Sequence, residues 1–419
     1  MITVTTHEEV AGWAAGLDEV GERIAGRFVR PASRRQAEVY LRGLLGPVER
    51  KNGWQLAEHA ADPTPDRMQW LLGRARWDAD EVRDDLRAYV VAHLADPAAV
   101  LIGDETGMPK KGTKSVGVQR QYCGALGKVD NCQVGVLLAY AGPRGTAFVD
   151  RELYLPDGWA ADADRRAEAG VPREVECRTK PELLRAMLER LATAGVPIPW
   201  VTADEEYGSA PALRAWLTGR RIPAVLGVRA NEPVRAPRVV PLVTWVRGQE
   251  PGPPVDTAVV LEQTAREVAA ALAADAWQTL SAGEGSQGPR LSQWAAVALA
   301  EPAPAGWAQW LLVRRSPSEP SDLAYYRVCA PAETPLAEQV RVAGARWRIE
   351  DALGEAKGTT GLDHYEVRRW VGWYRHVTLA LLAHAFLVVT RARTVELVGG
   401  APASRRARNP RGGSPISSH

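Results

Sequence analysis

Residues 99–124 read AVLIGDETGMPKKGTKSVGVQRQYCG. The apolar run at the start of this stretch is typical of a buried β-strand, and Asp104 and Glu105 follow it directly. From Thr106 to Lys128 the chain then carries five lysine and arginine residues and no acid. A carboxylate at the end of a buried strand, with a cationic glycine-rich loop behind it, predicts a site at this point of the fold.

The segments that follow predict a mixed sheet between residues 98 and 228. Three β-rich runs separated by Gly and Pro turns are typical of consecutive antiparallel strands: AVLIGDE, QVGVLLAYA and GTAFVDRELYLP. A helix, a strand, a helix and a last strand follow, over KPELLRAMLERLATAG, PWVTADEEYG, PALRAWLTGR and IPAVLGV. Because helices alternate with strands after the antiparallel part, we expect an α/β fold.

Four further regions flank or interrupt this sheet. Residues 1–97 predict a helical domain, since apolar residues recur there at three- and four-residue spacing. Residues 229–336 are β-rich and irregular, and we interpret them as an insertion rather than a continuation of the sheet. Helical spacing resumes over 337–395, whereas residues 396–419 are poor in hydrophobic residues and are expected to be disordered.

The charge of the chain is small overall but unevenly distributed. The net charge is +2 for 419 residues, yet eight lysine and arginine residues stand against three glutamates between Gly21 and Lys51. Local basic segments in a nearly neutral chain favour a polyanion that is met at defined places. A solvated basic face explains either segment equally well when it is taken alone.

Cysteine usage and hydropathy favour a cytoplasmic protein that does not enter a membrane. The four cysteines have neither zinc-ligand spacing nor a dense disulfide pattern, which fits a reducing compartment. The N-terminus lacks the basic and apolar regions of a signal peptide. The most apolar stretch, VTLALLAHAFLVV, is too short to span a bilayer and contains His384, so we expect a buried helix there.

Three acids stand where strand and helix geometry would bring them together. Asp104 ends the first strand of the predicted sheet, Asp204 ends the strand PWVTAD, and Glu350 lies on a helix after the insertion. The ends of neighbouring strands meet at one edge of a sheet, where α/β proteins place their sites. Converging carboxylates repel one another unless a hard cation holds them, and Mg²⁺ or Mn²⁺ suits oxygen ligands. Two such ions can activate water and stabilise the leaving oxygen in phosphodiester cleavage.

The helix around Glu350 supports this interpretation. Arg346, Glu350 and Lys357 fall within roughly 40° of one another on one helical face at about 100° per residue. An acid flanked by two cations suits a metal ligand beside a bound phosphate. An ordinary surface charge ladder with an i,i+4 Arg–Glu pair accounts for the spacing equally well.

The stretch RWRIEDALGEAK resembles the signature of bacterial insertion-sequence transposases with an Asp-Asp-Glu triad. In one cut-and-paste branch this signature is built from Tyr, Arg, Glu and Lys. Arg346, Glu350 and Lys357 stand in that register here, with Ala343 at the tyrosine position. Further stretches are similar to one group of these elements: GLLGPVERKNGWQLAE, DETGMPKKGTKSVGVQRQYCGALGKVDNCQVGV, WVTADEEYG, SAGEGSQGPR and AKGTTGLDHYEVRRWVGWYRHVTLALLAHAFL.

This resemblance implies an RNase H-like catalytic core that a β-rich insertion interrupts between the second Asp and the Glu. It implies that Asp104, Asp204 and Glu350 are the catalytic triad and hold two Mg²⁺ or Mn²⁺ ions. Arg346 and Lys357 would contact the phosphates of the transposon end. The expected activity is DNA cleavage at transposon ends followed by strand transfer to a target. Two alternatives stay open: a host-recruited DNA-binding protein without transposition, and a simple metal-dependent nuclease.

The resemblance also implies double-stranded DNA as the partner, namely terminal inverted repeats and target DNA. Pairing two ends requires two active sites, so we expect a homodimer on DNA, associated with the bacterial nucleoid. The stretch GMPKKGTK nearly matches a nucleotide P-loop, but Thr113 stands where the lysine is needed, which argues against a nucleotide cofactor. The residues expected to contact DNA, besides Arg346 and Lys357, are basic residues of the glycine-rich loop and of the N-terminal helices: Lys110, Lys111, Lys114, Arg120, Arg34, Arg35, Arg50 and Lys51.

Overall fold

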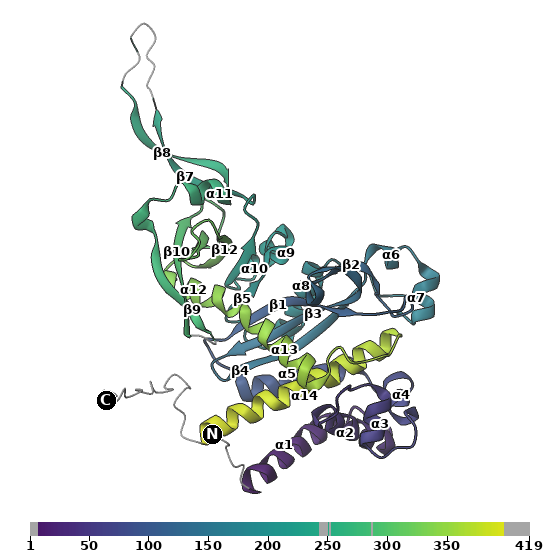
Figure 1. The fold of residues 1–419 in the computed structure, drawn as a ribbon. Helices are drawn as coiled ribbons and strands as arrows, with labels where there is room; N and C mark the ends of the chain where they lie inside the picture. The colour runs from purple at the N-terminus through teal and green to yellow at the C-terminus, as the bar shows by residue number, and fades with distance from the viewer. Residues whose placement is uncertain (1–6, 243–249, 251–252, 286–287, 398–419) are drawn as a thin grey trace, which may run out of the picture.

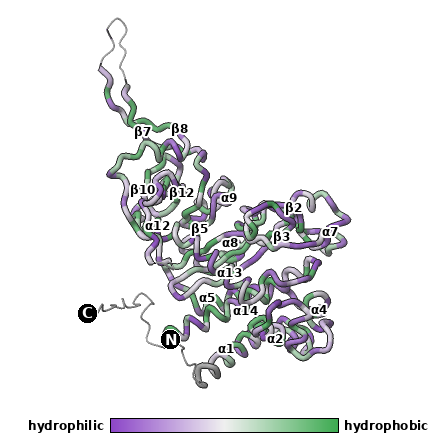
Figure 2. The backbone as a smooth tube through the Cα atoms, in the orientation of Figure 1, coloured by the Kyte–Doolittle hydropathy of each residue, from purple (hydrophilic) through white to green (hydrophobic). Residues whose placement is uncertain are grey.

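The structure is a computed structural model of the chain, and it describes residues 7–242, 250, 253–285 and 288–397. Figure 1 shows a body built on one large sheet, with a layer of helices beneath it and a two-stranded arm that projects from one end. Figure 2 shows hydrophobic residues along much of the sheet and of the long C-terminal helix.

The large sheet has ten strands in the described part of the chain. Their order is β2-β3-β1-β5-β6-β12-β11-β10-β9, and β4 pairs with β3. β1 runs antiparallel to β3 and parallel to β5, which in turn runs parallel to β6. The strands are β1 (Val100–Pro109), β2 (Gln119–Cys123), β3 (Lys128–Gly142), β4 (Gly145–Tyr154), β5 (Val201–Ala203), β6 (Ala224–Val228), β9 (Gln278–Gly285), β10 (Gly288–Ala298), β11 (Trp307–Arg315) and β12 (Leu323–Pro331). This mixed sheet, with helices before it, confirms the predicted RNase H-like α/β fold class.

Helices cover both faces of the sheet. Gly103 of β1 faces Leu184 of α8, whereas Met108, on the other face of β1, reaches Trp373 of α14 beside Gly135. Successive residues of a strand point to opposite faces, so α8 and α14 lie on opposite sides of the sheet. The helices of the core are α6 (Asp157–Ala160), α7 (Ala163–Ala169), α8 (Lys180–Thr193), α9 (Glu205–Gly208), α10 (Pro211–Gly219), α12 (Leu336–Ala345), α13 (Trp347–Thr360) and α14 (Trp370–Leu397).

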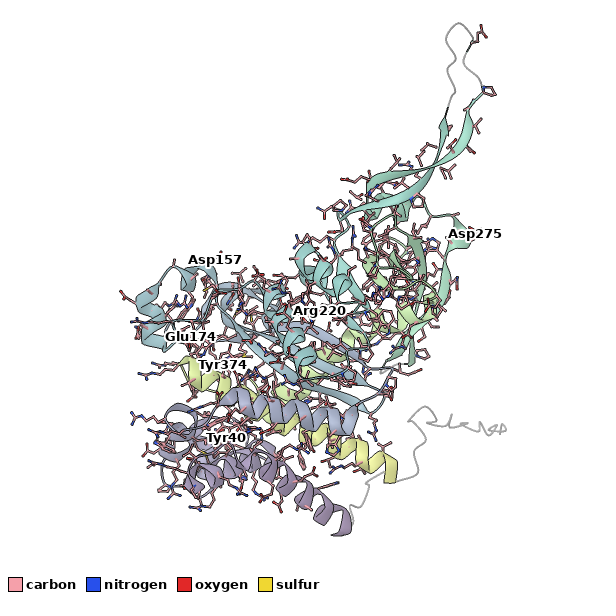
Figure 3. The ribbon with its side chains drawn as sticks, turned by 180° about the vertical axis from the view of Figure 1, so that it is seen from behind. Tyr40, Asp157, Glu174, Arg220, Asp275 and Tyr374 are labelled. Carbon is pink, nitrogen blue, oxygen red and sulfur yellow. The ribbon has the colours of Figure 1, made fainter. Side chains whose placement is uncertain are left out.

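The N-terminal helices pack against α14. They are α1 (His7–Ala25), α2 (Pro31–Leu45), α3 (Gly53–His59), α4 (Asp66–Gly73) and α5 (Ala79–Leu94). Asn52 caps α3, because its side chain accepts hydrogen bonds from the backbone N–H groups of Trp54 and Gln55. Tyr40 of α2 meets His376 of α14, with 2.7 Å between Oη and Nδ1. Figure 3 shows Tyr40 in this helical layer below the helix that carries Tyr374.

Buried residues of these helices, of the sheet and of α14 form one continuous core. The division of the chain into separate domains at residues 97, 228 and 336 therefore stays a prediction. Of the expected disordered tail, residues 398–419 lie outside the described residues, and Glu396 and Leu397 belong to α14.

α14 is the core helix of the molecule. By length and composition its stretch Trp370–Val395 passes as a membrane span, but 67% of its 18-residue apolar window is buried inside the protein. Arg375 anchors it to the N-terminal layer, because its buried guanidinium donates hydrogen bonds to carbonyl groups at the end of α4 and in the loop after it. The expectation of a buried helix at this place is met.

We expected the β-rich region to be an insertion rather than a continuation of the sheet. In the structure its strands β9–β12 continue the sheet. β12 pairs with β6 over Tyr325–Val228 to Cys329–Ala224, and β11, β10 and β9 follow it outward. These strands extend the same sheet, because the edge of β6 leaves backbone groups that must find partners. Between them and β6 the chain forms a helix, α11 (Ala265–Ala270), and the arm.

The arm consists of β7 (Pro233–Leu242) and β8 (Val255–Thr264), which pair antiparallel along their whole length. It carries exposed valines, among them Val239 at 63% and Val255 at 59% exposure. Three prolines recur every fourth residue on β7: Pro233, Pro237 and Pro241. Arg235 lies an even number of residues from each proline, so its backbone groups point to the same side of β7 as theirs. Its N–H donates to Glu301, and its C=O accepts from the N–H of Ala300, both outside the ribbon. The prolines therefore lie where backbone nitrogen atoms face away from β8.

Candidate active site

Asp104 and Asp204 stand at the point where two parallel strands separate. Gly103 of β1 pairs with Ala203 of β5, and each aspartate is the next residue. Asp204 then caps α9 by accepting a hydrogen bond from the N–H of Glu206. We expected Asp104 to end its strand, but β1 continues to Pro109 because β3 still pairs with it there. The aspartate instead marks the end of the parallel pairing.

The two carboxyl groups share a poorly solvated space. Burial, and then the charges of Asp204 and Glu105, raise the pKa of Asp104 to about 7. Burial also raises the pKa of Asp204. Desolvation and a like charge both disfavour the ionised form of an acid, so this pair resists ionisation in the absence of a cation.

Arg346 links Asp104 to Glu350. Its guanidinium lies 3.8 Å from Oδ2 of Asp104 through Nη1, and 3.2 Å from Oε1 of Glu350 through Nη2. Arg346 stands at the junction of α12 and α13, and Glu350 lies in the first turn of α13. The i,i+4 pair of a surface ladder is thus present, but a plain ladder would lack the contact to Asp104.

The donor set fits a divalent cation in part. Two carboxyl groups that resist ionisation beside each other are oxygen ligands that a hard cation would stabilise. Among the described residues, however, no three Asp, Glu, His or Cys side chains come close enough to hold a metal ion. The side chain of Glu350 is 55% exposed and bonds to Arg346, so it would join Asp104 and Asp204 only by exchanging that partner for the ion.

Sequence reasoning missed Glu105, which points to the face of β1 opposite Asp104. Its carboxylate accepts hydrogen bonds of 2.7 Å from Nζ of Lys180 and from Oη of Tyr207. Tyr207 lies three residues after Asp204 on α9, so this bond fastens α9 to β1 just beyond the last paired residues. The adjacent acids in GDET were the signal, since neighbours in a strand point to opposite faces.

Two glycines allow α9 to approach the sheet closely. A Cβ at Gly208 would overlap the carbonyl oxygen of Gly227 in β6. A Cβ at Gly227 would come within 3.0 Å of the backbone carbon of Asp204. The position of the Asp204 backbone thus depends on the absence of side chains at both places.

Two lysines beyond Asp104, one in contact with β1 and one directly after it, are partly withdrawn from solvent. Nζ of Lys357 donates to the carbonyl of Gly107 at 3.3 Å, on the open edge of β1 beyond Asp104. Nζ of Lys110 donates to the carbonyl of Tyr365 at 3.1 Å and lies 3.6 Å from the centre of its ring. Burial lowers the pKa of Lys357 and lowers that of Lys110 to about 8.

The other predicted DNA contacts differ in their solvent exposure and in whether they already form ion pairs. Lys111, Arg120, Arg35 and Arg50 are exposed. Lys114 is exposed but pairs with Glu168 at 2.8 Å.

Two cations of the N-terminal helices are committed within the protein. Arg34 pairs with Glu22 at 2.6 Å and Glu38 at 3.4 Å. Lys51 is buried at 3% exposure, and its ammonium donates to the carbonyl of Gly46. Burial thus argues against Lys51 as a DNA contact, and we withdraw it from the set.

One protein family and one insertion-sequence transposase are similar to this chain. The family model described as DDE superfamily endonuclease matches residues 23–289, which include Asp104 and Asp204 but end before Glu350. A probable transposase for insertion sequence element IS701 from Microchaete diplosiphon is 31% identical over 167 residues. This alignment covers 40% of the chain and 41% of that relative. Since the family model spans more than half of the sequence, the chain belongs to the DDE superfamily of endonucleases.

Proposed function

We propose that the protein is a transposase that cleaves DNA at the ends of an insertion sequence and joins the freed 3′ ends to target DNA. One observation carries the proposal. Asp104 and Asp204 follow directly on a paired residue of two parallel strands, and their proximity contributes to a pKa of about 7 for Asp104. The similarity to a probable IS701 transposase supports the same activity, although it covers less than half of either chain.

Membership of this superfamily implies a divalent metal requirement in general. Asp104 and Asp204 would hold the ions, with Glu350 as the third ligand, and we propose two Mg²⁺ or Mn²⁺ ions. When bound, such ions supply an activated water and charge stabilisation for the leaving oxygen.

The cations of the site have separate proposed roles. Arg346 lies beside Asp104 and pairs with Glu350 in the structure, and it would become available for a DNA phosphate once a cation takes its place. Lys357 lies on the open edge of β1 next to this space and would contact the same DNA end. Ionised carboxyl groups repel the phosphates of DNA. Both cations reduce this repulsion between the site and the phosphodiester.

Cleavage of both ends and their joining require two active sites, and we propose a homodimer that assembles on DNA in the cytoplasm. The tyrosine position of the signature is occupied by Ala343, which is buried in α12. Ala343 therefore offers no hydroxyl group to the DNA at this place.

The test is Mg²⁺-dependent cleavage of a duplex that carries the element's end. Asp104→Asn, Asp204→Asn and Glu350→Gln should each abolish cleavage while the affinity for the duplex is kept. Asp351→Asn is the matched control, because Asp351 is an exposed acid on the same helix. Normal cleavage by any of the three variants would remove that residue from the proposed triad.

A metal-dependent nuclease that does not join strands is the second candidate, because the family description names an endonuclease. Pre-cut ends incubated with a plasmid and Mg²⁺ distinguish the two activities. A transposase yields a covalently joined product, whereas a nuclease yields none.

A further inference from the structure

Three segments far apart in the chain meet at the end of β1. Nζ of Lys110 binds the carbonyl of Tyr365, and the N–H of Val116 donates to the carbonyl of Arg368 at 2.9 Å. The N–H of Lys51 donates to Nδ1 of His364 at 3.2 Å. Residues 50–54, 110–116 and 361–369 thus form one continuous piece of surface, which we call the junction surface.

Four cations of the junction surface are uncommitted. They are exposed, and no hydrogen bond or ion pair of their side chains is found among the described residues: Arg50, Lys111, Arg368 and Arg369. Two acids lie nearby, of which Glu366 accepts a hydrogen bond from Asn52 and Asp363 lies 3.8 Å from His364. The cations outnumber these acids, so the junction surface attracts anions.

A groove of about 380 Å³ adjoins these cations. Trp54 forms part of its lining together with Arg368 and Arg369, and the side chain of Trp54 is 62% exposed. Exposed arginines beside an exposed indole suit a ligand that offers phosphates and flat apolar faces together. Nucleic acid has both, whereas a small anion has no use for the indole.

The distance of this surface from Asp104 indicates which base pairs of a bound duplex it would contact. β1 leads from Asp104 to Pro109, and Lys110 follows, six residues after Asp104. An extended strand rises about 3.3 Å per residue, so the junction surface begins about 20 Å from the carboxyl groups. A duplex that follows β1 covers this distance in about six base pairs.

We propose that the junction surface grips the transposon-end duplex about six base pairs from the cleaved phosphate, with Arg50, Lys111, Arg368 and Arg369 on the backbone and Trp54 against a sugar or base edge. This inference rests on the proposed function. It adds Trp54, Arg368 and Arg369 to the DNA-contacting residues and fixes where on the duplex they act.

The first test is the salt dependence of binding to a fluorescent end duplex. Each lost phosphate contact reduces the slope of log K against log salt concentration by about 0.9, so Arg368→Ala/Arg369→Ala should reduce it by about 2. Trp54→Ala should weaken binding without changing the slope, because no charge is lost. Arg173→Ala/Arg266→Ala is the matched control, since both arginines are exposed and lie outside the junction surface. An unchanged slope in the Arg368/Arg369 variant would overturn the inference.

The second test maps phosphates by ethylation interference on the end duplex and on an unrelated duplex of equal length. We expect interference about six base pairs from the cut on the end duplex, and its loss in the Arg368/Arg369 variant. Interference of equal strength along the unrelated duplex would instead assign the surface to target DNA and overturn the register. Cleavage assays keep the two proposals apart. An enzyme that cuts normally with an unchanged slope refutes the junction surface alone, and a protein that binds in this register but never cuts refutes the transposase proposal alone.

Discussion

The pKa of Asp104 predicts that metal binding is linked to pH. A carboxyl group with a pKa of about 7 is roughly one-tenth ionised at pH 6 and nine-tenths ionised at pH 8. The metal needs the ionised form, so the apparent affinity for Mg²⁺ should rise about tenfold over this range, or about 1.4 kcal/mol. Burial is the first cause of the raised pKa and Asp204 the second, so Asp204→Asn should weaken this pH dependence without removing it.

Isothermal titration of the DNA-free protein with Mn²⁺ or Mg²⁺ at pH 6, 7 and 8 measures this effect. Two buffers of different ionisation enthalpy count the protons released, and we expect nearly one proton per protein at pH 6 and almost none at pH 8. Asp104→Asn separates this carboxyl group from the histidines, which titrate in the same range. An affinity that stays constant from pH 6 to 8, or the same pH dependence in Asp104→Asn, would refute the reasoning.

The same shift has a consequence for stability, with a definite sign. The folded carboxyl group of Asp104 holds its proton more tightly than the unfolded chain, whose value is near 3.8. The stabilisation is therefore complete below pH 4 and is lost as the pH rises through 7, by up to about 4 kcal/mol in the metal-free protein. Thermal melts without metal should show this decrease, and Mg²⁺ should reverse it at pH 8.

Three substitutions test how the site and the long helix α14 are held in place. Gly208→Ala should lower the free energy of unfolding by about 1–3 kcal/mol and reduce cleavage, because the new methyl group overlaps the carbonyl of Gly227; a melting temperature equal to that of the unmodified protein would contradict this. Tyr207→Phe removes a hydrogen bond to Glu105 and should lower the free energy of unfolding, measured by urea denaturation, by about 1 kcal/mol. An unchanged free energy of unfolding would show that this bond is absent in solution. Arg375→Leu leaves several buried carbonyl groups without their donor and should cost about 3 kcal/mol, and a neutral result would show that water replaces the guanidinium.

The fold of the core could be predicted from the sequence because its strands are short apolar runs with clear turns between them. The place of Asp104 and Asp204 followed from the same pattern, since each stands directly after such a run. The extension of the sheet by β9–β12 could not be predicted, because strand order depends on which distant edge is free. The local sequence pattern predicts that a strand forms, but it does not predict which strand it pairs with.

The burial and the partners of individual charged side chains could not be predicted from the sequence either. Lys51 and Arg50 are neighbours with the same charge, yet Lys51 turns inward to the carbonyl of Gly46 and Arg50 stays exposed. Glu105 and Asp104 show the same contrast, one bound to Lys180 and Tyr207 and the other facing Arg346. Burial of a long side chain depends on contacts with segments hundreds of residues away, such as Gly361, which packs against the side chain of Lys51, and local spacing does not reveal them.

The spacing of the prolines in β7 limits how this protein can associate with itself. A ribbon of two strands normally offers two sides for added strands, and chains that add on both sides grow without end. Here Pro237 and Pro241 have no N–H to offer on the outer side of β7, so within the described part of the ribbon only β8 presents a full edge to a neighbouring strand. Two molecules that met through β8 would use up the accepting side of each, and the assembly would stop at a pair instead of growing into a fibre.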